Sequence, residues 1–155
     1  AHARATGGEL GPVENDDYAS ALVRFASGAR GVLEASRVAV GDQNAYGFEI
    51  HGTKGAVHWD FRRLGELGLS TGTAYQDQPV STVYVAPGAG EYAAFQPGAA
   101  NAMGYDDLKV IEAARFVRSI AEGQPHGATL ADAVHSAQAL DAMLASAESG
   151  AWVRL

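Results

Sequence analysis

Polar and apolar positions alternate along the first half of the chain, and this alternation predicts strands. In residues 17–26 one set of alternate positions is entirely apolar, comprising Ala19, Ala21, Val23 and Phe25. A period of two residues is typical of a half-buried strand. Similar patterns predict strands over residues 31–40, 45–51 and 56–61, with shorter candidates at 66–71 and 80–86.

The segments between these strands are short and carry turn-forming residues, such as Gly41-Asp42-Gln43-Asn44 and Gly52-Thr53-Lys54-Gly55. Connections of a few residues join antiparallel neighbours, because parallel strands require crossovers of a dozen residues or more. The first half is therefore predicted to be an antiparallel meander. Gly55 is expected to occupy a turn position with positive φ.

The last third changes to a helical period. Asp106 or Asp107 is expected to cap a helix over residues 108–122, which ends before Gly123. Thr129 and Asp132 resemble a capping box that starts a second helix, running to about residue 149. Residues 151–155 suggest one last short strand, and residues 86–104, rich in Gly, Ala and Pro, suggest a long loop that is functional or mobile.

Strands followed by helices predict an α+β domain, namely a mainly antiparallel open sheet with helices packed on one face. At 155 residues the chain is expected to form a single domain, 1–155. The uncovered face of the sheet would carry Leu22 or Phe25 together with Val32 or Leu33. Because a large exposed apolar face is commonly covered by a partner, we expect an oligomer or a second domain.

Composition narrows the function classes. A net charge of −7 argues against a nucleic-acid partner, and the absence of cysteine excludes disulfides, thiolate metal sites and a Cys nucleophile. No apolar run is long enough for a membrane helix and no signal peptide is visible, so we expect no membrane association and a cytoplasmic location. The chain does not begin with Met, which suggests a processed or truncated product.

Standard catalytic and nucleotide motifs are absent from this sequence. It contains no G-x-S-x-G elbow, no phosphate-binding P-loop and no G-x-G-x-x-G that opens a βαβ unit. His51 and His58 lie on adjacent predicted strands, but no third ligand has convincing spacing. They are therefore interpreted as solvent-facing strand residues.

Three residues are candidates for substrate contact, each with a structural alternative. Arg37 lies mid-strand, where it could bind an anion or hydroxyl group or form a surface cross-strand pair. Asn44 could recognise a polyol through its amide or simply form a turn. Tyr105 precedes two aspartates at a predicted helix start, so this group could contact substrate or merely cap the helix.

Four segments, in order and spacing, resemble the C-terminal domain of the Gfo/Idh/MocA oxidoreductases, the relatives of glucose–fructose oxidoreductase and inositol dehydrogenase. They are DDYASALVRFASGARGVLEASRVAVG, NAYGFEIHGTKGAVHWDF, MGYDDLKVIEAARFVRSIAEGQP and TLADAVHSAQALDAMLASAESGAWVRL. The resemblance covers residues 13–155. It implies a parent protein with an N-terminal Rossmann domain for NAD or NADP and reversible hydride transfer to or from a sugar or cyclitol hydroxyl. It also implies a homo-oligomer formed through the open sheet face.

The departures from the family decide what this chain can do alone. The Gly-rich nucleotide loop, the Glu-Lys-Pro motif and the Asp/His pair of the family are not found. The chain is thus expected to supply no catalytic, cofactor-binding or metal residue, and to be inactive in isolation. Counting back from Glu49-Ile50-His51-Gly52 places Asn44 at a substrate-contact position of the family, and sheet-edge placement adds Arg37 and Tyr105. The alternative is a free-standing, non-enzymatic binding or assembly module that uses the same sheet.

Overall fold

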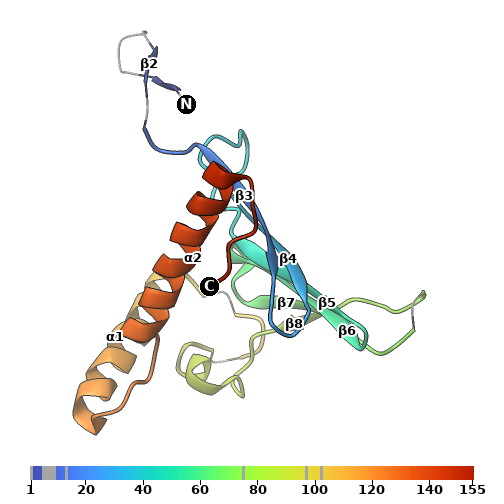
Figure 1. Ribbon diagram of the computed structural model, residues 1–155. Coiled ribbons are helices and arrows are strands. Elements are labelled where there is room, and N and C mark those ends of the chain that lie inside the picture. The colour runs from blue at the N-terminus through green and yellow to red at the C-terminus, as the bar shows by residue number, and fades with distance from the viewer. Residues whose placement is uncertain (1, 5–9, 13, 75, 97, 102) are drawn as a thin grey trace. The chain divides into compact units, whose positions relative to one another are not determined.

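The fold is described by a computed structural model, in which residues 2–4, 10–12, 14–74, 76–96, 98–101 and 103–155 are described (Figure 1). The chain divides into two compact units. The first unit comprises Ala1–Asp42 and Ser136–Leu155, and the second comprises Gln43–His135. Strands come first and the long helices last, which confirms the α+β class.

The first unit is built around an antiparallel hairpin. Strand β3 (Tyr18–Arg24) pairs with β4 (Arg30–Ser36), with Leu22 opposite Val32. The connection closes through two backbone hydrogen bonds between Phe25 and residues Gly28 and Ala29, and Gly28 has a φ of 90°. This unit also contains a short pair formed by β1 (His2–Arg4) and β2 (Leu10–Pro12), which the sequence pattern did not predict.

The predicted strands of this unit were too long. Strand β4 ends at Ser36 instead of residue 40, because beyond Arg37, whose N–H donates to the Asp17 carbonyl, the described ladder has no further rung. The short strand predicted over residues 151–155 is wrong, since this tail has no strand pairing. Alternation of side chains marks an extended segment, but a strand also needs a neighbouring backbone to pair with.

The second unit contains a four-stranded antiparallel sheet in the order β5-β6-β7-β8, as the meander prediction requires. The strands are β5 (Gly47–Gly52), β6 (Gly55–Asp60), β7 (Glu66–Thr71) and β8 (Ser81–Tyr84). The register places apolar side chains together on one face: Phe48, Ile50, Val57, Trp59, Leu67, Leu69 and Val83. The other face is mostly polar and includes Glu49, His58 and Thr82.

A tight turn sets the register of β5 and β6. Gly52 pairs with Gly55 across it, so Phe48 falls opposite Trp59. Gly55 has a φ of 153°, which confirms the predicted positive-φ position. A Cβ atom at this position would overlap the Ser70 carbonyl oxygen of strand β7.

Strand β6 ends in a short 3₁₀ helix, η1 (Phe61–Arg63). Asp60 caps this helix, because its Oδ1 accepts a hydrogen bond from the Arg62 N–H at 2.8 Å. The Arg62 guanidinium also donates to the same carboxylate, and these bonds lower the pKa of Asp60 to about 2. The start of this 3₁₀ helix is therefore capped by the Asp60 side chain.

The segment between β8 and the first long helix is not featureless. It contains a second 3₁₀ helix, η2 (Gly90–Phe95). Its flanks are tied by backbone hydrogen bonds from the Val85 N–H to the Gly65 carbonyl and from the Ala100 N–H to the Val85 carbonyl. The Arg115 Nε donates to Glu91 Oε2 at 2.6 Å, which lowers the pKa of Glu91 and links η2 to the helix that follows.

Two long helices end the chain. Helix α1 (Tyr105–Glu122) starts three residues earlier than predicted, and its N-cap is Gly104. Asp107 works from inside the first turn, where its Oδ2 accepts a hydrogen bond from the Gly104 N–H at 2.8 Å. Helix α2 (Leu130–Ser149) begins with the predicted Thr129–Asp132 capping box, in which the Thr129 N–H donates to Asp132 at 2.7 Å.

The C-terminal turn of α1 should respond to acid. Glu122 accepts hydrogen bonds from Arg118, Gln124 and His126, and these partners lower its pKa from 4.5 to about 2. A carboxyl group whose pKa is lower in the folded than in the unfolded protein stabilises the fold. This stabilisation is complete at pH values above the unfolded-state pKa and is lost as the pH falls through the folded-state pKa. We therefore expect an NMR titration of the Glu122 carboxyl to have its midpoint near 2. Arg118→Ala should raise that midpoint, and an unchanged midpoint would contradict the assignment.

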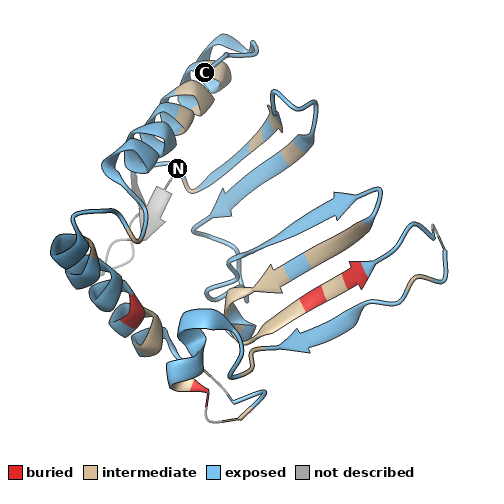
Figure 2. Cartoon of the chain, turned by 90° about the horizontal axis from the view of Figure 1, so that it is seen from below, coloured by how far each residue is buried: buried red, intermediate tan, exposed pale blue. Residues whose placement is uncertain are grey.

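Burial is sparse in the described part of the chain (Figure 2). The buried hydrophobic side chain is that of Ile111, and the polar residues Ser70 and Gln96 are also buried. By contrast, Phe48, Ile50 and Val83 are exposed on the apolar face of the second unit's sheet. Among the described residues, no helix has the length and apolar character needed to cross a membrane.

Candidate functional site

Asn44 lies between the two units' strands in sequence, just before β5, and belongs to the second unit. Its φ is 51°, a left-handed conformation that Asn tolerates better than most residues. Its backbone carbonyl accepts a hydrogen bond from the Tyr46 N–H at 2.8 Å, and the residue is exposed. The turn interpretation is thus correct for the backbone, while the exposed side-chain amide is still available for another role.

Five aromatic side chains, here called the aromatic cluster, gather in the second unit, and one of them, Tyr46, follows Asn44 by two residues. They are Tyr46, Phe48, Trp59, Phe61 and Tyr105. The Trp59 ring lies at 5.8 to 6.1 Å from three of the others, measured between ring centroids. Backbone hydrogen bonds support the arrangement, because the Tyr46 carbonyl accepts from the Phe61 N–H at 2.7 Å.

Tyr105 joins the cluster from the first turn of α1. Its ring meets the Phe61 ring edge-on, with the centroids 6.5 Å apart. The Lys109 ammonium lies 5.3 Å from the Tyr105 ring centroid, in a cation–π arrangement, and it donates to Glu112 at 2.8 Å. The Glu112 carboxylate raises the pKa of Lys109. The structure therefore brings Tyr105 into the same cluster as Tyr46, which follows Asn44 by two residues, and adds the positive charge of Lys109.

Arg37 belongs to the first unit and takes no part in the described contacts of the aromatic cluster. Its backbone N–H donates to the Asp17 carbonyl at 2.8 Å, immediately after β4 ends, and the residue is exposed. The prediction that it lies mid-strand is wrong, since β4 stops one residue earlier. Its proposed contact with substrate stays a prediction.

The histidines do not add a metal centre. His51 stands opposite Ala56 and not opposite His58, and its Nε2 lies 3.6 Å from Glu49 Oε2. His58 lies across Gly68 on the polar sheet face, close enough that a Cβ on Gly68 would overlap its ring. Within the described residues, no three histidine or acidic side chains converge on a possible metal position.

A hollow of about 460 Å³ lies beside the aromatic cluster, between the apolar sheet face and residues 85–108. Its walls are largely apolar and include Trp59, Leu67, Tyr92, Met103 and Leu108. The polar side chains along it are those of Glu66, Tyr84 and Tyr92, so a polyol bound there would replace few of its hydrogen bonds to water. The exposed part of the cluster is chemically better suited, because aromatic faces can contact C–H groups while the Tyr105 hydroxyl and the Lys109 ammonium offer hydrogen bonds.

The sequence singles out Asn44 and Tyr105 as candidates, and their substrate contacts stay predictions, whereas the aromatic cluster and Lys109 were not anticipated from it. A usable signal was present, since Tyr46 and Phe48 alternate within the predicted strand 45–51, and Trp59 and Phe61 alternate within the predicted strand 56–61. The turn at residues 52–55 fixes their cross-strand register, so the four rings could have been placed on one face by counting. The approach of Lys109 to Tyr105 follows from their four-residue spacing on a helix.

The chain is similar to known proteins. Residues 2–155 match the family described as "Oxidoreductase family, C-terminal alpha/beta domain" of the Gfo/Idh/MocA group. The chain belongs to this family. As a Gfo/Idh/MocA C-terminal domain, it is 37% identical over 147 residues to levoglucosan dehydrogenase of Pseudarthrobacter phenanthrenivorans, a match that covers 94% of this chain and 38% of that protein.

Solved structures of oxidoreductases are also similar to this chain. Levoglucosan dehydrogenase in complex with NADH and levoglucosan superposes with a TM-score of 0.86 and 37% identity, covering 92% of this chain and 39% of that one. An oxidoreductase domain protein from Kribbella flavida superposes with a TM-score of 0.84 and 30% identity, covering 93% of this chain and 39% of that one. This Gfo/Idh/MocA domain thus spans well under half the length of the relatives it matches.

The described residues do not fit a dinucleotide. A nucleotide phosphate is typically held at a helix N-terminus that follows a parallel strand and a glycine-rich turn. All strand pairs described here are antiparallel. The first turn of α1 carries Asp106 and Asp107, and that of α2 carries Asp132, so negative charge already occupies both helix starts and would repel a phosphate.

Proposed function

We propose that this domain is the substrate-binding half of an NAD(H)-dependent dehydrogenase that oxidises a hydroxyl group of a sugar or cyclitol. The observation that carries the proposal is the likeness, along nearly the whole chain, to a levoglucosan dehydrogenase known as a complex with NADH and its sugar. The nicotinamide cofactor is then held by the remaining part of the parent protein, because the described residues have no cradle for it. The domain by itself is expected to be inactive.

In this proposal the exposed edge of the aromatic cluster faces the sugar. The amide of Asn44 can donate and accept hydrogen bonds with neighbouring hydroxyls, and the Tyr105 hydroxyl can do the same. Lys109 contributes an ammonium group kept charged by Glu112. The rigid sheet beneath holds these groups in fixed positions and helps exclude water when the two halves of the parent protein close on the substrate. Arg37 belongs to the other unit and is proposed separately as a substrate contact.

The uncharged face of the β3–β4 hairpin is proposed to pack against a second copy of the protein. This face carries Ala19, Ala21, Val23, Leu33 and Ala35 together with Phe25 beyond the strand end. It bears no charge, and Phe25 and Leu33 are 57% and 46% exposed, so two copies could bury it without stranding an ion. A monomeric mass of the parent protein in solution would contradict this arrangement.

Substitution of Asn44 tests the substrate surface. In the parent protein, Asn44→Gly removes the amide without straining the left-handed backbone, and KM for the sugar should rise about two- to tenfold, with kcat little changed. Asn44→Ala should raise KM similarly and also destabilise the fold by about 1 kcal/mol, because alanine resists positive φ. Steady-state kinetics and thermal unfolding separate the two effects.

Two results would contradict the proposal at different points. An unchanged KM in Asn44→Gly would reduce Asn44 to a turn residue while leaving the dehydrogenase assignment intact. If the unmodified parent protein failed to reduce NAD⁺ with any of a panel of sugars and cyclitols, including levoglucosan, the proposed activity itself would be wrong, and a non-enzymatic binding or assembly role would be favoured.

A further inference from the structure

Two arginines face each other at the end of the β3–β4 hairpin. Arg24 and Arg30 are direct cross-strand partners in the first unit. Like charges placed directly opposite in an antiparallel pair repel each other and destabilise it. The ion pairs formed in the described part of the chain use other arginines, namely Arg62, Arg63, Arg115 and Arg118. Glu34 does not neutralise the two arginines, because it pairs with Ser20, which lies about 13 Å farther along the strands from the Arg24–Arg30 pair.

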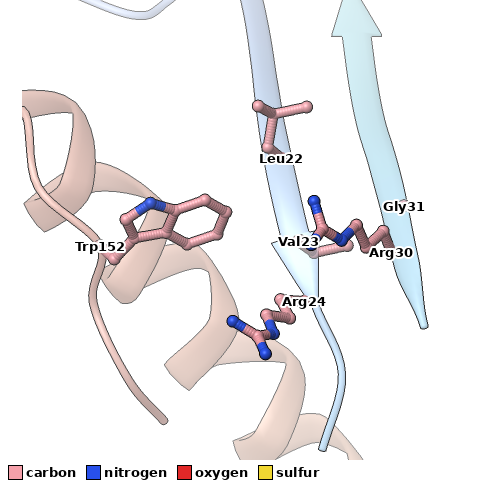
Figure 3. Close-up of a pocket in the computed structure, with 6 residues that line it drawn as sticks. All are labelled: Leu22, Val23, Arg24, Arg30, Gly31 and Trp152. Atoms are coloured by element: carbon pink, nitrogen blue, oxygen red, sulfur yellow. The ribbon is translucent and has the colours of Figure 1, made fainter. Parts of the chain in front are cut away.

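Trp152 lies on the same side of the hairpin as the two arginines (Figure 3). Helix α2 ends at Ser149, and the tail turns back at Gly150, which has a φ of 66°. Ser146 holds this bend, since its Oγ donates to the Ala151 carbonyl at 2.7 Å and its own carbonyl accepts from the Gly150 N–H. The indole that follows is 72% exposed, so most of its surface is accessible to a ligand.

These side chains border one hollow of about 310 Å³, which Leu22, Val23 and Gly31 also line. The two guanidinium groups extend from the hairpin toward the side where Trp152 lies (Figure 3). Guanidinium groups match the oxygen atoms of phosphates and carboxylates, and an indole offers a flat apolar face for stacking. An anion bound here would also remove the repulsion between Arg24 and Arg30.

We propose that this hollow binds a small organic anion in which a phosphate or carboxylate group is carried on a flat ring. The anionic group would lie between Arg24 and Arg30, and the ring would stack on Trp152 beside Leu22. The volume is at the lower end of the range for ligand pockets, which suits one ring with one anionic group. The proposal is independent of the dehydrogenase assignment, because none of these residues belongs to the aromatic cluster.

Fluorescence of Trp152 gives a direct test. The chain has two tryptophans, so Trp59→Phe leaves Trp152 as the reporter. The probes are phenyl phosphate, benzoate, inorganic phosphate and benzyl alcohol. We expect saturable quenching by phenyl phosphate or benzoate at millimolar concentrations, and binding at least tenfold weaker for inorganic phosphate and for benzyl alcohol. The comparison between the two ringed anions shows which anionic group the site prefers.

Variants then assign the binding to this site. Arg24→Gln and Arg30→Gln should each weaken binding about tenfold or more, whereas Arg118→Gln, whose guanidinium already pairs with Glu122, should leave it unchanged. Calorimetric titration of unmodified Trp59 protein repeats the measurement without the fluorescence reporter, and circular dichroism verifies that each variant is folded. Absence of saturation with both ringed anions, or equal binding by the arginine variants, would overturn the proposal.

Discussion

Replacing Gly55 by alanine should destabilise the second unit by about 3 kcal/mol. Two separate costs combine at this position. The φ of 153° lies in a region that only glycine adopts freely, and a Cβ atom would overlap the Ser70 carbonyl oxygen, which is backbone and cannot rotate away. Strand β7 would have to move away from β6, which would weaken the ladder that joins them.

Urea unfolding followed by circular dichroism measures the effect. Gly127→Ala is the matched control, because a Cβ there meets nothing within 4 Å and its backbone has no positive φ. That variant should stay within about 0.5 kcal/mol of the unmodified protein. A similar loss of stability in both variants would show that alanine is harmful for a reason unrelated to the turn.

Trp59→Ala should lower the free energy of unfolding by about 3 kcal/mol and loosen the packing of the aromatic cluster. Trp59 contacts the rings of Tyr46, Phe48 and Phe61, and its Nε1 donates to the Leu64 carbonyl at 3.2 Å. Removal of the indole deletes these ring contacts and the hydrogen bond together. If the cluster forms the sugar surface, KM of the parent protein should rise as well.

Two further substitutions isolate the cause. Trp59→Phe keeps a ring in place but loses the hydrogen bond, so a smaller cost of about 1 kcal/mol is expected. Trp152→Ala removes the same type of side chain from a position that is 72% exposed, and it should change the unfolding free energy by less than about 0.5 kcal/mol. Equal losses from Trp59→Ala and Trp152→Ala would contradict the packing role of Trp59.

The strand and helix content could be predicted because it follows from the local periodicity of apolar and polar residues. Strand β7 was predicted with its observed bounds, and the capping box was predicted from the three-residue spacing between Thr129 and Asp132. The ends were less predictable, since they depend on the partner segment. Val38 and Val40 continue the alternation of β4 but have no rung opposite them, and the apolar tail around Trp152 pairs with no strand.

The candidate site shows the same limit. The sequence singles out Asn44 by its position before a family motif, and the positive φ explains why Asn is suited there regardless of substrate. Tyr105 was chosen for its place at a helix start. Neither argument could reveal that Phe61 connects the two regions, because the Phe61–Tyr105 contact joins residues 44 positions apart in sequence. Contacts between residues so far apart in sequence depend on the tertiary fold, which local sequence patterns do not determine.

The four-residue turn between β5 and β6 also determines which changes of length this domain can accept. One residue inserted between Gly52 and Gly55 would rotate every following side chain of β6 to the opposite face, so that Trp59 would point to the side of Glu49 and His58 would enter the aromatic cluster. An insertion in residues 76–80, between β7 and β8, would lengthen an exposed connection without changing any pairing in β5 or β6. Natural relatives and engineered variants should therefore vary in length at the second position and keep the first constant.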